Sequence, residues 1–417
     1  MDLLSGNYTV KRIKLKGGHI DSKQHADGSL NIERALASKI PPEKVKEDLH
    51  LDLNSIVLEQ VDLSHLDEKS QLKVDAMIAK LESKFTTNDQ NVGWDVNTDF
   101  VLSVLQGKDS TFFSNKHCSI NSSLLFDKST SLLSLKKTQV RLEKTTLDLQ
   151  GNVECKGDFK VDMKLKGQKP DFNLFLSFAP QEYLEALNGF DNKGKIYFNA
   201  AVKGKTLHGN NPSIDVRFGC SEGLIRNENN DKKIKAIGFE GYFTNGASCS
   251  DSTSLFYVRN IQLKPEIGKF QGDIWIKNFK TPEIKMDVSA DLDLDFLSKF
   301  SQSSALKDVG GKVIINMHFH DMVDLEHPER VLQRFRDSYR SELKISDLHG
   351  KFDQLPYPIT HLNLLARSKG HQVDLENLSF QLGNSEVQIS GTLSDLPAMI
   401  HHSSTPVDVR LNLNAKF

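Results

Sequence analysis

The sequence predicts a mainly β protein: an elongated, curled, repetitive antiparallel β-sheet that forms an apolar groove and carries a few short helices. Three features of the 417-residue chain predict this class. Apolar and polar side chains alternate in many segments, glycine-led strand segments recur along the chain, and helical patterns are short and rare.

The alternation has a period of two residues, which is the mark of a strand with one buried face. It is clearest in FKVDMKL (159–165), IKMDV (284–288) and VRLNL (409–413). A second alternating segment, FNLFL (172–176), follows the first after a Pro and predicts another strand. Each such strand covers one face of a sheet and leaves the other face in water.

Helical patterns are confined to four places. Pro180–Leu187 predicts two turns, and Asp295–Phe300 and Leu396–His401 predict single turns. Pro328–Leu343 carries apolar residues at every fourth position, which predicts the longest helix.

A glycine that is followed by an apolar residue recurs about every 39 residues, a period typical of a repetitive architecture. The glycines are Gly157, Gly194, Gly241, Gly272, Gly311, Gly350 and Gly391. Several of them open similar segments, such as GDFKVDMKLKG and GKVIINMHF, and several are followed by a Pro and a second alternating strand. We therefore expect a β-rich N-terminal part over residues 1–150 and a repetitive β-groove region with short helices over 151–417.

Composition excludes several classes of function. The formal net charge of −2 gives no basic footprint for nucleic acid. The chain has 24 Phe but only 7 Tyr and 2 Trp, which favours an apolar strand surface over an aromatic sugar site. No stretch approaches the roughly 18 apolar residues of a membrane-spanning helix.

No catalytic motif and no cofactor motif is present, so we expect neither an enzyme nor a cofactor. His318 and His320 share a strand face but have no third ligand, and we interpret them as a solvated pair. The four cysteines form no CxxC pair. Free thiols are the first interpretation, and a Cys220–Cys249 bridge is the alternative if the chain lies in an oxidising compartment.

The alternating apolar sets are the candidates for lining a lipid groove, and ordinary packed core is the alternative for each of them. The candidates are Phe159, Val161, Met163, Phe172, Leu174, Ile196, Phe198, Ile214, Val216, Ile274, Ile276, Ile284, Met286, Val313 and Ile315.

Several segments resemble the AsmA family. The opening LLSGNYTVKRIKLKGGHIDSKQHADGSLNIERAL leads to a dG-x-x-N element at Asp27–Asn31. The middle, with GKIYFNAAVKG and NPSIDVRFG, is similar to the repeated strand, Pro, strand and short-helix units of the family. In the tail, LPYPI, LENL and GNS resemble AsmA-like proteins of the Bacteroidetes type, and the resemblance covers nearly the whole chain.

The resemblance implies a function. Members of this family are related to TamB and to bridge-like lipid-transfer proteins, and an N-terminal helix anchors them in the inner membrane, from which they project into the periplasm. Their implied role is envelope biogenesis, with phospholipid or another acyl lipid conducted toward the outer membrane and envelope proteins as further partners. By this resemblance the present chain is a soluble fragment without the anchor.

Two other classes of function remain open. A structural or protein-binding β-scaffold of the periplasm would have a closed apolar face and would bind no lipid. A carbohydrate-active enzyme would need paired carboxylates with aromatic platforms, and the few Trp and Tyr argue against it.

Overall fold

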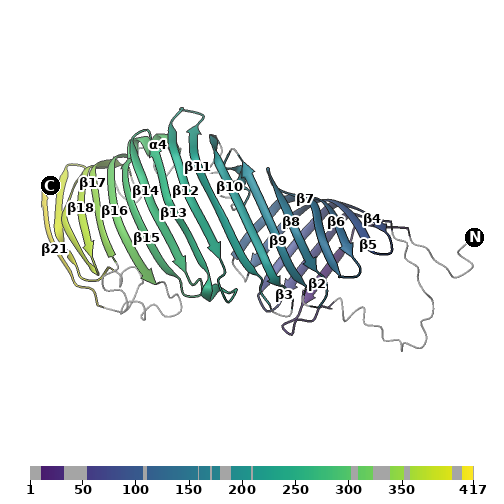
Figure 1. The fold of residues 1–417 in the computed structure, drawn as a ribbon. Helices are drawn as coiled ribbons and strands as arrows, with labels where there is room; N and C mark the ends of the chain where they lie inside the picture. Colours follow the sequence, from purple (N-terminus) through teal and green to yellow (C-terminus); the bar gives the residue numbers. More distant parts are fainter. Residues whose placement is uncertain are drawn as a thin grey trace, which may run out of the picture. The chain divides into compact units, whose positions relative to one another are not determined.

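The computed structural model describes residues 11–31, 54–106, 110–157, 159–169, 171–178, 189–207, 210–301, 309–322, 339–351, 357–396 and 406–416. It is 74% strand and 5% helix, and its 21 strands belong to one sheet (Figure 1). The mainly β, repetitive sheet with a few short helices is therefore confirmed. The expected curl is not found: the sheet is open and uncurled.

The strands are numbered in chain order. The first nine are β1 (Arg12–Lys16), β2 (His19–Gln24), β3 (Ser55–Asp67), β4 (Leu72–Thr87), β5 (Asn91–Gln106), β6 (Ser110–Asp127), β7 (Leu132–Leu142), β8 (Thr145–Glu154) and β9 (Lys160–Lys169). The next six are β10 (Phe190–Lys205), β11 (Ser213–Asn227), β12 (Lys233–Thr244), β13 (Leu255–Pro265), β14 (Gly268–Lys277) and β15 (Glu283–Asp293). The last six are β16 (Gly310–Met322), β17 (Tyr339–Gly350), β18 (Ile359–Lys369), β19 (Gln372–Leu382), β20 (Ser385–Leu393) and β21 (Val409–Lys416).

Almost all pairings join strands that are adjacent in the chain and antiparallel. This holds from β3 to β9 and again from β11 to β21. The expectation of an antiparallel sheet is wrong at the N-terminal edge, where β1 and β2 both run parallel to β3. Gly17 and Gly18 separate these two short strands. Their φ angles of 69° and 125° are backbone conformations that residues other than glycine rarely adopt.

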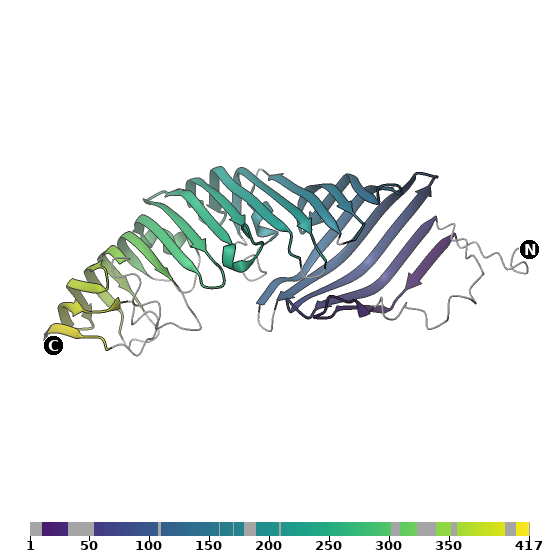
Figure 2. The same ribbon diagram turned by 60° about the horizontal axis from the view of Figure 1, so that its bottom comes forward.

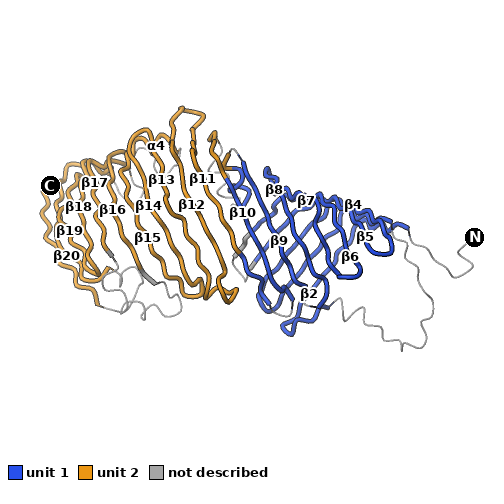
Figure 3. Tube along the Cα trace, in the orientation of Figure 1, with its two compact units in different colours: residues 1–169, 173–188, 197–214 blue, residues 170–172, 189–196, 215–417 orange. Residues whose placement is uncertain are grey.

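The chain divides into two compact units (Figure 3). Unit 1 comprises residues 1–169, 173–188 and 197–214, and unit 2 comprises residues 170–172, 189–196 and 215–417. In unit 2 the strands β11 to β21 form a single layer, as Figure 2 shows from a second direction.

The helices differ in part from those expected. The expected turn at Asp295–Phe300 is confirmed as α4 (Leu294–Ser301). The segment 172–176 is not a strand, because Phe172 lies in a turn and Asn173–Leu176 forms the short helix α2. A three-residue 3₁₀ turn, η3, spans Asp251–Thr253. Pro180–Leu187 and nearly all of Leu396–His401 lie outside the described residues.

The expected helix over Pro328–Leu343 is wrong at its C-terminal end. Tyr339–Leu343 belongs to strand β17, where Leu343 lies opposite Ile315 of β16. The residues before Tyr339 lie outside the described part of the chain. Recurrence at every fourth residue also fits a strand, because four is a multiple of the two-residue strand period.

β-Bulges keep the apolar side chains on one face even where the alternation changes phase. In β13 the bulge at Asn260 (φ 54°) lies between Val258 and Ile261, so an even-numbered and an odd-numbered residue face the same side. A bulge near Asp347 (φ 51°) does the same in β17. The extra residue restores the register that a strict two-residue count would lose.

The most buried side chains in unit 1 lie where α2 meets the sheet. Leu174 of α2 is fully buried, and Leu147 of β8 is 2% exposed. A Cβ at Gly167 of β9 would lie 2.4 Å from Cδ2 of Leu147 and 2.9 Å from Cδ1 of Leu174, so a larger residue would force both leucine side chains to shift. The hydroxyl of Thr145 donates to the Asn173 carbonyl at 3.0 Å and fixes α2 to β8.

In unit 2 the comparable site is α4, whose Phe296 and Phe300 are buried and stack at 5.7 Å. The amide of Asn227 on β11 donates to the Phe300 carbonyl at 2.8 Å, which satisfies the end of the helix. Among the described residues, no helix is long and apolar enough to cross a membrane.

Candidate functional site

The main candidate site is the apolar face of the sheet in unit 2. Directly opposed residues in a sheet share a face, so the strand register shows which side chains lie together. One row crosses seven strands, from β13 to β19, and consists of Leu263, Phe270, Ala290, Ile315, Leu343, Ala366 and Leu375. A second row crosses β15 to β21 and consists of Leu292, Val313, Ile345, Leu364, Leu378, Ile389 and Leu413. Apolar side chains therefore meet apolar side chains across every strand boundary.

This apolar face is only partly covered. Of the described residues after Val309, no apolar side chain falls in the buried class, and most on these rows are half-buried. Exposure is greatest on β21, where Leu411 is 57% exposed and Leu413 is 67% exposed. The face thus offers apolar surface to a ligand, in contrast to the interior of a closed sandwich.

Unit 1 has an apolar face of the same kind, and one of its rows is more deeply buried than the rows of unit 2. Val61, Ile78, Phe100, Cys118 and Leu142 form a row across β3 to β7. Four of the five are buried, and Phe100 is half-buried. This row contributes core, whereas a second row of unit 1 is half-buried like those of unit 2 and consists of Val92, Phe126, Leu133, Val153 and Val161.

The structure places most of the predicted groove residues on these apolar faces. In unit 2, Ile274 lies opposite Met286 and Ile276 opposite Ile284, while Val313 and Ile315 belong to the two long rows. Val216 lies opposite Phe243. In unit 1, Val161 lies opposite Val153, and Met163 lies opposite Gly151. Ile214 belongs to unit 1, lies at the start of β11, most of which belongs to unit 2, and is half-buried.

The remaining predicted residues have other positions. Phe159 precedes β9 with φ of 43° and is 40% exposed. Phe172 is half-buried in a turn, Leu174 is fully buried in α2, and Ile196 of β10 is 3% exposed. Phe198 stacks on Phe178 with ring centroids 4.9 Å apart, as a packed pair within unit 1.

Sequence reasoning missed the apolar side chains of β17 to β20, among them Leu343, Leu364 and Leu378. Their signal is present in ITHLNLLA and VDLENLSF, but bulges in β17, β18 and β19 shift its phase. A search that allows one extra residue within an alternating run would have found them.

The opposite face of the same strands is polar. One row across β14 to β18 consists of Asp273, Asp287, His318, Arg340 and Lys369. His318 Nδ1 bonds to Asp287, and Nε2 of His320 bonds to Glu283 at 2.7 Å. The two histidines are thus paired with carboxylates of the neighbouring strand, and no cluster of three or more metal-ligating groups occurs among the residues that the structure describes.

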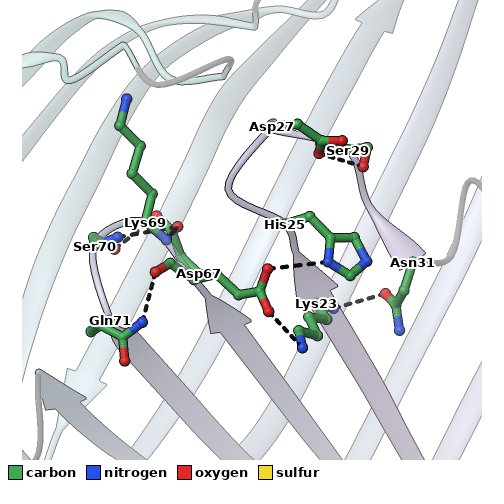
Figure 4. Close-up of polar contacts among 10 residues, drawn as sticks. Lys23, His25, Asp27, Ser29, Asn31, Asp67, Lys69, Ser70 and Gln71 are labelled. Carbon is green, nitrogen blue, oxygen red and sulfur yellow. Dashed lines mark hydrogen bonds and ion pairs between the residues drawn. The ribbon is translucent and has the colours of Figure 1, made fainter.

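The Asp27–Asn31 element of the N-terminal part forms a locked turn (Figure 4). The Asn31 side chain accepts the backbone N–H of Lys23 at 2.7 Å and donates to the Asp21 carbonyl at 3.0 Å. Glu68 pairs with Nζ of Lys23 at 2.6 Å and with Nδ1 of His25 at 3.2 Å. These contacts hold β2 against β3 and give the element a clear structural role.

All four cysteines are free in the structure, so the Cys220–Cys249 bridge is not formed. Burial raises the pKa of Cys118 to about 11, and burial likewise raises the pKa of Cys220 to about 11. Thiols with such pKa values are poor nucleophiles at neutral pH.

Comparison with known proteins gives no neighbour: no family model, no curated protein and no solved structure matches this chain.

Proposed function

We propose that this protein binds acyl lipid, foremost phospholipid, on the apolar face of its sheet and conducts it between the inner and outer membranes of a bacterial envelope. The resemblance to the AsmA family supports this role and the periplasmic location that goes with it, with an anchor to the inner membrane in the full-length protein. The proposal includes no catalytic step and no cofactor.

The observation that carries the proposal is the continuous, half-exposed apolar face from β13 to β21. Exposing a 16-carbon chain to water costs about 12 kcal/mol at about 0.8 kcal/mol per CH₂. An apolar row that continues from strand to strand removes most of this cost at every point along the sheet. Because neighbouring strands lie about 4.8 Å apart, a lipid can advance in small steps with no high barrier between them.

The alternation of apolar and polar side chains also lets the lipid head group remain in water. Each strand turns its polar side chains away from the apolar rows, so an acyl chain on one face leaves the other face in water. Head groups remain in water along the open sheet. Transport of this kind needs a path and no nucleotide site in the chain itself.

The second candidate function is a structural or protein-binding scaffold. It is favoured by the buried apolar row of unit 1, which is already packed and offers no surface to lipid. It predicts that the protein purifies without lipid and takes none up.

The test compares two matched rows on β18, β19 and β20. Leu364, Leu378 and Ile389 lie directly opposite one another on the apolar face. Asn363, Ser379 and Gln388 form the adjacent row on the polar face. Changing either row to Asp introduces three carboxylates on the same three strands, so the two variants differ only in the face that they charge.

Native mass spectrometry and lipid extraction then follow purification from bacterial cells without detergent. We expect phospholipid with the unchanged protein and with the polar-row variant, and its loss from the apolar-row variant. If the apolar-row variant does not fold, a photo-crosslinkable phospholipid added to the unchanged protein must label peptides of β18 to β20. Absence of lipid and of labelling would favour the scaffold.

A further inference from the structure

The polar face of unit 2 contains a cavity, open to solvent over much of its boundary, that the lipid proposal does not use. Its volume is about 800 Å³, within the range of roughly 300–1,000 Å³ of small-ligand sites. Strands β13 to β17 line it, with Gln262, Gln271, Asp273, Asp287, His318 and Arg340 among the lining residues. The cavity lies on the opposite side of the strands from the apolar rows.

The lining groups combine hydrogen-bond donors and acceptors at close spacing. The two carboxylates accept, Arg340 donates, and the amides of Gln262 and Gln271 do both. Sugar hydroxyls likewise donate and accept, so they match this mixture. The two carboxylates face Arg340 of the lining and Nζ of Lys285, which lies 3.8 Å from Asp287 Oδ2, so the charges balance and leave no net positive field for a phosphate or another anion.

The two carboxylates are held in place. Asp273 and Asp287 lie directly opposite each other, an arrangement of like charges that destabilises a sheet. Asp273 Oδ1 accepts the backbone N–H of Asn260 at 2.6 Å, and Asp287 bonds to Nδ1 of His318. The bulge at Asn260 directs this N–H toward Asp273. Nζ of Lys285, 3.8 Å from Asp287 Oδ2, offsets part of the repulsion, and these contacts together hold both carboxylates in fixed positions at the wall of the cavity.

An aromatic row lies beside the cavity on the same face. Tyr242, Tyr257 and Trp275 are directly opposed on β12, β13 and β14, with ring centroids 5.3 Å and 4.6 Å apart. Trp275 lies two residues from Asp273 on the same strand and is half-buried. Sugar rings present C–H groups on one side and hydroxyls at the rim, so they pack on an aromatic surface while they hydrogen-bond to neighbouring polar groups.

We propose that this face binds a neutral oligosaccharide, with a sugar ring against Trp275 and its hydroxyls in the cavity of Asp273 and Asp287. The inference goes beyond the lipid proposal and does not depend on it, because the two sites lie on opposite faces of the sheet. It also revises the expectation that the few aromatic residues exclude a sugar site. Three of the chain's nine Tyr and Trp residues (7 Tyr + 2 Trp) stand in this one row.

The test uses an array of neutral glycans built from hexoses, deoxyhexoses and N-acetylhexosamines, followed by calorimetry with the glycans that bind. The chain has two Trp, so Trp94→Phe leaves Trp275 as the only tryptophan, whose emission can be excited selectively over that of the tyrosines. We expect a dissociation constant of about 1 mM or lower for at least one glycan. We also expect a change in Trp275 emission on binding.

Three variants locate the site. Trp275→Leu and Gln271→Ala should each weaken binding about tenfold or more, measured by calorimetry. Asp291→Asn is the control, because Asp291 lies on β15 outside the cavity lining and pairs with Lys312. If Trp275→Leu does not fold, the proposal is tested by the affinity of Gln271→Ala and by the change in Trp275 emission on binding in the Trp94→Phe protein. No binding on the array, or binding that Trp275→Leu and Gln271→Ala both leave unchanged, would overturn the proposal.

Discussion

Gly167 and Leu147 provide a test of how tightly the α2 end of unit 1 is packed. Gly167→Ala places a methyl group 2.4 Å from Cδ2 of Leu147 and 2.9 Å from Cδ1 of Leu174. Overpacking of this kind costs about 1–3 kcal/mol of unfolding free energy. Leu147→Ala removes a side chain that is 2% exposed and should cost about 3–5 kcal/mol.

The double variant separates packing from other causes. Leu147→Ala empties the space that the new methyl group needs, and Leu174 can shift into the rest. We therefore expect the double variant to be at least about 1 kcal/mol more stable than the sum of the two single effects predicts.

The assay is urea unfolding followed by the fluorescence of Trp94, which lies on β5 of unit 1, in a Trp275→Phe background. A matched control repeats the cycle with Met77→Ala in place of Leu147→Ala, because Met77 is 54% exposed. That pair should show no coupling. Strict additivity of Gly167→Ala and Leu147→Ala would refute the packing argument.

Three further predictions follow from single sites. Because burial raises the pKa of the Cys118 and Cys220 thiols, iodoacetamide at pH 8 should modify the other two cysteines in the native protein and spare these two until urea unfolds it, which peptide mass mapping would detect. Hydrogen bonds from Ser129 and Thr130 lower the pKa of Asp127 to about 2. The ionised carboxylate therefore stabilises the fold at pH values above its ordinary pKa, and this stabilisation is lost as the pH falls toward 2. Asp127→Asn should flatten the acid limb of a stability-against-pH curve, and an unchanged limb would count against this assignment. Asn260→Val should destabilise unit 2 by about 1–2 kcal/mol because of its positive φ, whereas Asn260→Gly should not, as urea unfolding followed through Trp275 would show.

The sequence was sufficient to predict the β class, the position of many strands and which side chains face together within a strand. Ile284, Met286 and Val288 alternate without interruption, so their shared face follows from the period alone. Prediction failed where a local feature changed the period. The segment at Leu174 alternates like a strand, but burial against Leu147 and Gly167 stabilises a helical turn there instead.

The polar-face site was out of reach of sequence reasoning for a different reason. Tyr242, Tyr257 and Trp275 are separated by 15 and 18 residues (257 − 242 and 275 − 257). Only the strand register brings the three rings together, and the bulge at Asn260 helps to set that register. Short motifs cannot reveal a site whose members come from a different strand each time.

The pairing of each strand with its neighbours in the chain has a consequence for mechanical and folding behaviour. In the described part of the chain, each strand from β11 to β20 pairs with the strand that follows it, so loop closure is local there. Such an array resembles a one-dimensional chain of coupled units, in which cooperativity extends only as far as the coupling between neighbours. Pulled from the β21 edge, unit 2 should peel one strand at a time in a series of small force steps, and the strands left behind should keep their register.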